Sequence, residues 1–171
     1  SQENTEVTPL DIKLSSSVLV KGTSTLHDWE SVVERTDAKM KLNSLEKNSI
    51  ETLEVKIEAI SLKSGKKLMD KLTYKALKAE EFPLITFIFK KGEIVSDTTK
   101  VLTLKLQGDL TIAGVTKNVS VITTINKLDN QITLHGEYKL KMTDYGIKPP
   151  KALLGTIKTG DEITIEFNLN F

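Results

Sequence analysis

Cysteine is absent from the 171 residues, and histidine and tryptophan are scarce, with two and one. Without cysteine there can be no disulfide framework, no thiol catalysis and no cysteine-ligated zinc or iron–sulfur site. His27 and His135 are the only imidazole ligands, and no third candidate ligand stands at a recognisable spacing from either of them. We therefore expect neither a metal nor a cofactor.

Neither sign of charge is in excess, and long apolar runs are missing. The 24 basic and 23 acidic residues leave a net charge of +1, without the basic stripe that is typical of nucleic-acid binding. No apolar run reaches the length of about eighteen residues that a membrane-spanning helix needs. Nucleic acid is therefore not an expected partner, and an integral membrane segment is not expected.

The chain begins with the polar stretch SQENTEVTP and no initiator methionine. We interpret it as a mature or trimmed chain, from which a secretion signal would already be missing. Residues 1–9 are expected to be frayed or disordered, and 10–171 to form a single domain.

What is abundant is alternation of apolar and polar residues with a period of two. It is clearest at the positions 53–59, 84–89, 102–112, 119–125, 132–142 and 163–171. Each such strand has one apolar face, whereas a parallel sheet covered by helices would have continuously apolar strands. With turns at 43–48 and 129–130 and a loop over 143–160, roughly eight strands predict an all-β, antiparallel closed barrel. A two-sheet sandwich is the alternative.

One segment changes period. Between Lys66 and Glu81, apolar residues recur at spacings of three and four (Leu68, Leu72, Ala76 and Ala79). This spacing predicts one amphipathic helix of about four turns, ended before Pro83.

The predicted inner face is aliphatic, with Gly22, Gly108 and Gly136 interrupting it. An eight-stranded barrel is either filled by its own side chains or holds one small ligand. The glycines favour a cavity that suits a hydrocarbon chain, although they could instead only permit the barrel to bend.

The most distinctive stretch is GTSTLHDWE, residues 22–30, where His27 and Asp28 precede the only tryptophan, Trp29. On a strand, neighbouring side chains point to opposite faces, so His27 and Trp29 would share a face and Asp28 would not. We expect His27 and Trp29 to pack together at or near the cavity, with His27 as a hydrogen-bonded structural residue. There is no nucleophile elbow, HExxH helix or phosphate loop, so no catalytic residue is expected.

Four segments together resemble the YceI-like family of polyisoprenoid-binding barrels. They are GTSTLHDWE (22–30), AEEFPLITFIF (79–89), LKLQGDLTIAGVTKNVSV (104–121) and MTDYGIKPPKALLGTIKTGDEITIEFNL (142–169). The resemblance implies a lipocalin-like antiparallel barrel with a helix inserted between strands. It also implies an isoprenoid-like lipid inside the barrel, export to the periplasm or secretion, and a homodimer as a frequent assembly.

We therefore predict a non-catalytic protein that binds and carries a polyisoprenoid, quinone or fatty-acid ligand inside the barrel. The alternatives are a filled barrel that serves as a structural or protein-interaction module, and an enzyme that acts on the bound lipid with His27 as base. The residues predicted to bind the ligand are His27, Trp29, Ile57, Leu72, Phe87, Leu104, Leu106, Tyr138 and Phe167.

Overall fold

The computed structural model describes residues 9–43, 49–126 and 131–171. Residues 1–8 of the frayed segment predicted at 1–9, residues 44–48 of the turn predicted at 43–48, and the turn predicted at 129–130 lie outside the described residues.

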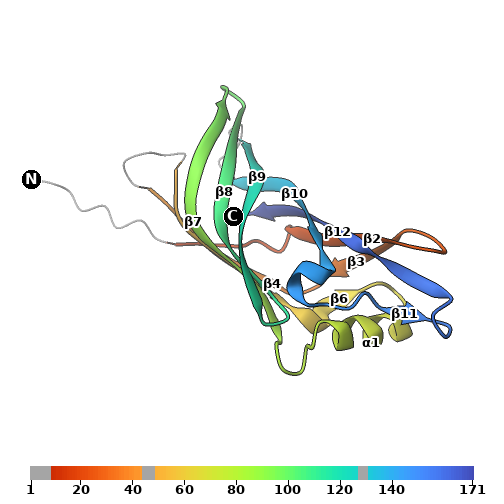
Figure 1. Cartoon of the computed structure of the whole chain (residues 1–171). Coiled ribbons are helices and arrows are strands. Elements are labelled where there is room, and N and C mark those ends of the chain that lie inside the picture. The colour runs from red at the N-terminus through yellow and green to blue at the C-terminus, as the bar shows by residue number, and fades with distance from the viewer. Residues whose placement is uncertain (1–8, 44–48, 127–130) are drawn as a thin grey trace, which may run out of the picture.

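Most of the described residues form strands (Figure 1). The strands are β1 (Leu10–Asp11), β2 (Ser17–Ser24), β3 (Trp29–Val33), β4 (Thr36–Leu42), β5 (Ile50–Glu58), β6 (Leu62–Lys63), β7 (Leu84–Asp97), β8 (Val101–Ile112), β9 (Val115–Asn126), β10 (Thr133–Lys141), β11 (Lys151–Ala152) and β12 (Ile157–Asn170). The helices are α1 (Lys67–Ala76) and the 3₁₀ turns η1 (Ala59–Ser61) and η2 (Met142–Tyr145).

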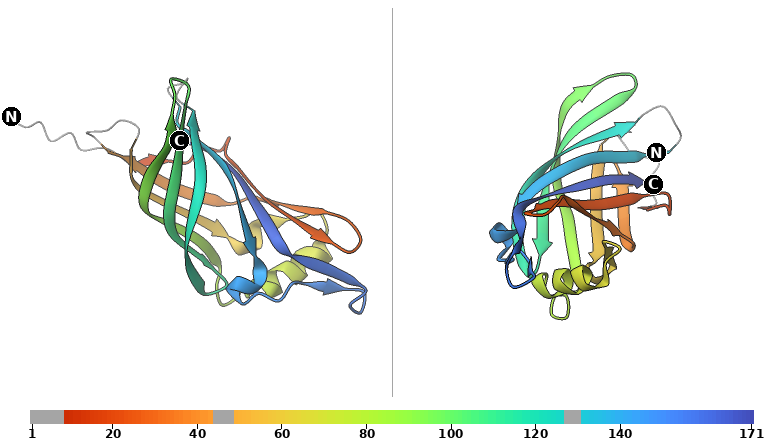
Figure 2. Two further views of the ribbon diagram at one scale, coloured as in Figure 1. Left: turned by 45° about the horizontal axis from the view of Figure 1, so that its top comes forward. Right: turned by 90° about the vertical axis from the view of Figure 1, so that its right-hand side faces the viewer.

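All strand pairs are antiparallel, and the sheet order is β1-β4-β5-β7-β8-β9-β10-β12-β2-β3-β6. The two ends of this path meet, because β3 continues into β4 and β5 continues through η1 into β6. Backbone hydrogen bonds join the two bent strands at this corner, from Glu34 N–H to the Ser61 carbonyl (2.9 Å) and from Glu58 N–H to the Arg35 carbonyl (3.2 Å). With each bent pair counted as one strand, eight long strands curl around one interior (Figure 2).

This arrangement confirms the predicted all-β, antiparallel lipocalin-like barrel of about eight strands with one inserted α-helix. The regular alternation made the strands predictable, since every second side chain must leave water on a curled sheet.

The helix is shorter than the predicted span of 66–81. It ends at Ala76, because Lys78 adopts a left-handed backbone conformation with φ of 53°. The Lys78 N–H then bonds to the Lys75 carbonyl, and the Ala79 N–H to the Tyr74 carbonyl, which is the bonding pattern that commonly closes a helix. Glycine usually occupies this position, so the apolar spacing carried no signal of the stop.

The predicted loop over 143–160 is partly ordered into secondary structure. It contains most of η2, all of β11 and the first residues of β12. Proline and glycine in this stretch obscured the short strand pairing of Ala152 with Ile157.

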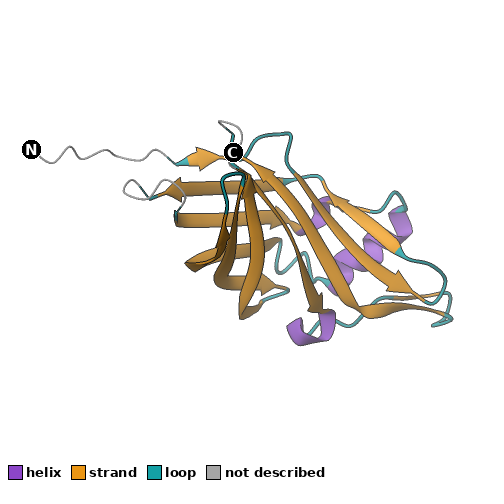
Figure 3. Cartoon of the chain, turned by 90° about the horizontal axis from the view of Figure 1, so that it is seen from above, coloured by secondary structure: helices purple, strands orange, loops and turns teal. Residues whose placement is uncertain are grey.

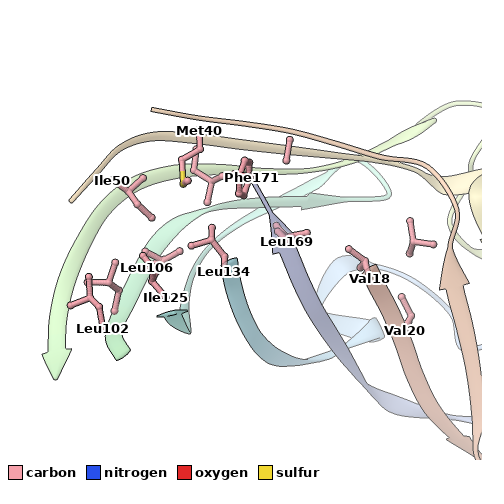
Figure 4. Close-up of a cluster of buried hydrophobic side chains, with 14 of the residues drawn as sticks. Val18, Val20, Met40, Ile50, Leu102, Leu106, Ile125, Leu134, Leu169 and Phe171 are labelled. Carbon is pink, nitrogen blue, oxygen red and sulfur yellow. The ribbon is translucent and has the colours of Figure 1, made fainter. Parts of the chain in front are cut away.

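One end of the interior is filled by side chains. Met40, Leu102 and Leu134 are almost completely buried there, and Figure 4 shows side chains from several strands converging on the same space. Leu104 and Leu106 belong to the same cluster. Each such side chain contributes about 1.5–3 kcal/mol through burial, so this end supplies much of the stability.

A second buried cluster lies around η2 and includes Tyr145, Met142 and Ile147. Phe87 and Phe167 pack against both clusters. These two rings therefore connect the filled end of the barrel with the rest of the interior.

Two strand glycines make room for these rings. A Cβ atom added at Gly108 would lie 2.7 Å from the Phe87 ring and 2.5 Å from the Ile88 carbonyl oxygen. One added at Gly136 would lie 2.7 Å from the Phe167 ring. These contacts are shorter than van der Waals separations, so only glycine fits here without a shift of the sheet.

The variant Gly108→Ala is expected to lower the free energy of unfolding by about 1–3 kcal/mol, because the Ile88 carbonyl oxygen belongs to the backbone of the sheet and cannot turn aside as a side chain can. Gly92→Ala is the matched control on the adjacent strand, where the added Cβ would make an ordinary contact at 3.5 Å. Urea denaturation of both variants tests this. Equal stability of the two variants would contradict the prediction.

The phenol of Tyr145 makes the free energy of unfolding depend on pH in the alkaline range. Burial raises the pKa of its phenol to about 12, above the value of about 10 in an unfolded chain. Folding therefore favours the neutral phenol, and its contribution is intact below pH ~10 and lost as the pH rises towards ~12. Tyr145→Phe should make the decline of unfolding free energy over this range shallower; an unchanged decline would contradict this.

Candidate functional site: a cavity beneath the helix

The other end of the interior is hollow. A cavity of about 570 Å³ lies between the inner face of the sheet and α1, within the range of about 300–1,000 Å³ that is usual for small-molecule sites. An apolar cavity of about 150 Å³ already accepts benzene. The cavity found here is therefore large enough for a considerably longer hydrocarbon.

Aliphatic side chains from opposite sides of the barrel form its main wall. They alternate with outward-facing residues along their strands, as the sheet geometry requires. The contributing residues are Val18, Val20, Val33, Ile57, Leu62, Ile85, Ile112, Ile163 and Ile165. Several of them are only half buried, although they are apolar and face the interior, because the cavity itself exposes them.

The helix provides a second wall through Met69, Leu72, Thr73, Ala76 and Leu77. These positions follow the three- and four-residue spacing of a single helix face. Figure 3 shows α1, the longest purple helix, at the end of the strands that lies away from the C-terminus.

Two polar contacts hold α1 in place. The carboxylate of Asp70, which is buried, accepts hydrogen bonds from the Ser64 N–H (3.0 Å) and the Ser64 hydroxyl (2.6 Å). The Tyr74 hydroxyl donates to the Leu62 carbonyl at 2.6 Å. Asp70 also lies in the first helical turn, where a negative charge is favourable.

The third wall comes from η2 and the segment after it, through Met142, Ile147, Pro150 and Ala152. The Asp161 carboxylate anchors this segment by accepting hydrogen bonds from the Thr143 N–H (2.9 Å) and hydroxyl (2.6 Å). These bonds hold the pKa of Asp161 below its ordinary value, because they stabilise the charged form.

Polar and charged residues gather where the lining reaches solvent. Ser24, His27, Asp28, Ser64, Lys66, Lys151 and Thr159 belong to the lining, and His27, Asp28, Lys66 and Lys151 are exposed. The exposed apolar residue Leu26 lies among them. We call this rim the mouth of the cavity.

His27 and Asp28 lie in the connection between β2 and β3, not on a strand. Strand alternation therefore does not apply to them, and both residues belong to the cavity lining together with Trp29. His27 is held by its Nδ1 atom, 2.7 Å from the Asp28 carbonyl, and by its N–H, which donates to the Ser24 hydroxyl at 3.1 Å. The expected separation of His27 from Asp28 is thus wrong, since the chain bends before β3 begins.

Trp29 lies at the start of β3, directly opposite Gly22 on β2. Its ring occupies the place of a side chain at Gly22, and its Nε1–H donates to the Thr23 carbonyl at 3.0 Å. Aromatic rings likewise cover Gly108 and Gly136. The three glycines therefore do not themselves leave the gaps in the inner face that the sequence suggested; they accommodate rings, and the cavity lies elsewhere.

The structure brings four of the predicted ligand-binding residues together in the lining: His27, Trp29, Ile57 and Leu72. Leu104 and Leu106 lie in the filled cluster, because β8 crosses both ends of the barrel and these positions face the closed one. Phe87 and Phe167 pack between the two clusters, and Tyr138 packs against the second. Burial raises the pKa of Tyr138.

Sequence reasoning did not select the cavity residues between 147 and 159, because 143–160 is predicted as a loop, nor Met142, which is predicted to end a strand. The apolar residues Ile147 and Ile157 were the available signal, since an exposed loop has no need of them. Met69 was missed for a similar reason, as it was not part of the Leu68–Leu72–Ala76 series.

The described residues contain no group of three or more His, Asp or Glu side chains that could hold a metal ion. Within the same residues, no helix combines the length and apolarity needed to cross a membrane.

Comparison with known proteins matches the chain to one family. The family model described as the YceI-like domain covers residues 10–171, whereas no curated protein sequence matches. Among solved structures, BcnA of Burkholderia cenocepacia is similar with a TM-score of 0.80 at 19% identity, over 94% of this chain and 99% of that chain.

Two other structures share the fold. A polyisoprenoid binding domain from Saccharophagus degradans, implicated in plant cell wall breakdown, has a TM-score of 0.75 at 10% identity, over 96% of this chain and 98% of that one. The YCEI protein of Campylobacter jejuni has a TM-score of 0.65 at 18% identity, over 100% and 92%. At these identities the structures show the fold alone, but the family match spans nearly the whole sequence. The chain belongs to the family of YceI-like domains.

Proposed function

We propose that this protein binds and carries a hydrophobic ligand in the cavity beneath α1, without chemical conversion. The observation that carries the proposal is an aliphatic cavity of about 570 Å³ that opens at a polar mouth. The charged residues of the lining are all exposed, whereas its fully buried residues are apolar except for Ser31.

The lining favours a long apolar chain over a compact polar molecule. Each buried methylene group is worth about 0.8 kcal/mol, so a chain gains affinity steadily as it extends inward. The charged side chains of the lining are exposed, and at the mouth they would meet the head group of an amphiphile; Ser31 and Thr73 are polar residues of the lining outside the mouth. His27 would take part through its Nε2 atom, since Nδ1 is occupied by the Asp28 carbonyl.

The ligand class proposed is a polyisoprenoid, a quinone or a fatty acid. Membership of the YceI-like family supports this class, and so does the similarity to a domain described as polyisoprenoid binding. Members of the family are typically periplasmic. On this basis we propose that the protein is periplasmic or secreted.

Binding without catalysis is consistent with the geometry around His27. Its ring contacts a backbone carbonyl instead of a carboxylate, whereas a general base is normally oriented by an acid and lies beside a nucleophile. His27→Ala should therefore weaken the binding of a fatty acid only through the lost head-group contact, and should leave the affinity for an alkane without a head group unchanged.

A series of saturated fatty acids of increasing length tests the proposal directly. The dissociation constant is expected to fall about fourfold per methylene group until the chain fills the cavity, and then to level off. Trp29 is the only tryptophan and lines the cavity, so its fluorescence measures binding without a label.

Affinity that does not depend on chain length would refute the proposal. Solvent extraction of the purified protein followed by mass spectrometry gives an independent test, with a co-purifying lipid as the expected result.

A larger side chain at Ala76 should shorten the longest chain that the cavity accepts. Ala76 is half buried and faces the cavity from α1, so Ala76→Phe is expected to weaken binding of long fatty acids at least tenfold and to spare short ones. Lys75→Phe is the matched control, because it adds the same ring one position away on the exposed side. Equal effects of the two variants would show that the ligand does not occupy this cavity.

A further inference from the structure

Four leucines are exposed at the end of the molecule that carries the cavity mouth. Their side chains belong to three separate segments, and the exposed fractions are 67% for Leu26, 71% for Leu68, 70% for Leu153 and 106% for Leu154. Leu26 itself lines the cavity, and Leu68 adjoins the lining residue Met69. Apolar side chains of this size at neighbouring tips need a reason, since water is their least favourable surrounding.

The turn that presents Leu153 and Leu154 is unusual for these residues. Both have left-handed backbone conformations, with φ of 49° and 56°, and the Gly155 N–H closes the turn on the Ala152 carbonyl. Asparagine and glycine are the residues that such a turn favours. Two leucines here cost backbone energy and gain no burial within the chain, which points to a role outside the folded domain.

The β2–β3 connection, which carries Leu26, lies beside the β11–β12 hairpin, which carries Leu153 and Leu154. The Thr25 N–H donates to the Lys158 carbonyl at 3.0 Å, and the Lys158 N–H donates to the Thr25 hydroxyl at 3.1 Å. These bonds join the β2–β3 connection to the β11–β12 hairpin. Figures 1 and 2 show both hairpins and the start of α1 at the same end of the barrel.

Positive charge accompanies the leucines. The three segments that form this end, 24–30, 64–71 and 147–159, contain six lysines and three carboxylates, for a net charge of +3. The whole chain has a net charge of only +1, so these three segments are more basic than the chain as a whole. One of the three carboxylates, Asp70, is buried and bonded to Ser64.

We infer that the mouth docks onto an anionic lipid bilayer, with Leu26, Leu68, Leu153 and Leu154 inserted among the head groups and the lysines paired with lipid phosphates. Apolar anchors surrounded by lysines are the combination that binds an interface of this kind. This inference rests on the proposed function, because the bilayer is the source or destination of the lipid. Docking would let the chain pass between membrane and cavity without crossing water.

The arrangement fits a bilayer better than a folded partner. The leucines project from three separate segments around an opening, instead of following one helix face or one strand. A fluid surface can accept such projections at any spacing, whereas a protein would need a matching set of holes.

The test is co-flotation of the protein with vesicles of phosphatidylcholine alone and of phosphatidylcholine mixed with phosphatidylglycerol. We expect binding to the anionic vesicles, decreasing with salt. The double variant Leu153→Asn, Leu154→Gly supplies the residues that the turn prefers, so it should fold at least as stably and bind vesicles more weakly by about tenfold or more per leucine. The triple variant Lys66→Gln, Lys151→Gln, Lys158→Gln should lose about fivefold per lysine on anionic vesicles only.

The control is Ile94→Thr, Val95→Thr, which removes two exposed apolar side chains from β7 at the far end of the barrel and should not change vesicle binding. Vesicle binding by the leucine double variant at the wild-type level would overturn the inference. So would a dimer in solution that this variant dissociates, because a second copy would then cover the leucines. Trp29 fluorescence in the absence of vesicles measures fatty-acid binding by itself and so separates the two proposals. If the wild-type protein binds no fatty acid, the carrier function is refuted. If it binds fatty acid but not vesicles, only the docking is refuted.

Discussion

Contact between strand glycines and aromatic rings is the constraint on which the interior of this barrel depends. Phe87 lies over Gly108 and Phe167 over Gly136, and each ring occupies space that any other residue at the glycine would fill. Because both rings touch both buried clusters, they tie the curled sheet together across its interior. The glycines allow the strands to bend, and the rings prevent the bent wall from leaving voids.

The two ends of the interior differ, because one is filled by side chains and the other contains the cavity. At one end, side chains from the surrounding strands meet and fill the space, as Met40, Leu102 and Leu134 do. At the other end, α1 and η2 lie over the cavity, and hydrogen bonds hold them there. The Asp70 carboxylate accepts one from Ser64, and the Asp161 carboxylate accepts one from Thr143. Since hydrogen bonds hold these segments in position, their apolar faces need not pack to the centre, and a cavity remains.

Strands were predictable from sequence because alternation is a local property that the sheet requires of every residue. The helix was predictable for the same reason, but its end was not, since Lys78 adopts a conformation that residue type alone disfavours. His27 and Asp28 show more clearly where prediction from the sequence fails. The assumption that they lie on a strand placed them on opposite faces, whereas the connection before β3 brings both to the cavity.

Composition and periodicity by themselves determined the all-β class, the inserted helix, the aliphatic inner face and the lack of cysteine chemistry, because each follows from residue type and spacing along the chain. Only the tertiary structure decided which inward residues fill the barrel and which line the cavity. Leu104 and Ile57 both face inward on regular strands, and nothing local distinguishes them. The difference lies in what stands opposite each side chain, and that is set by contacts between segments far apart in the sequence.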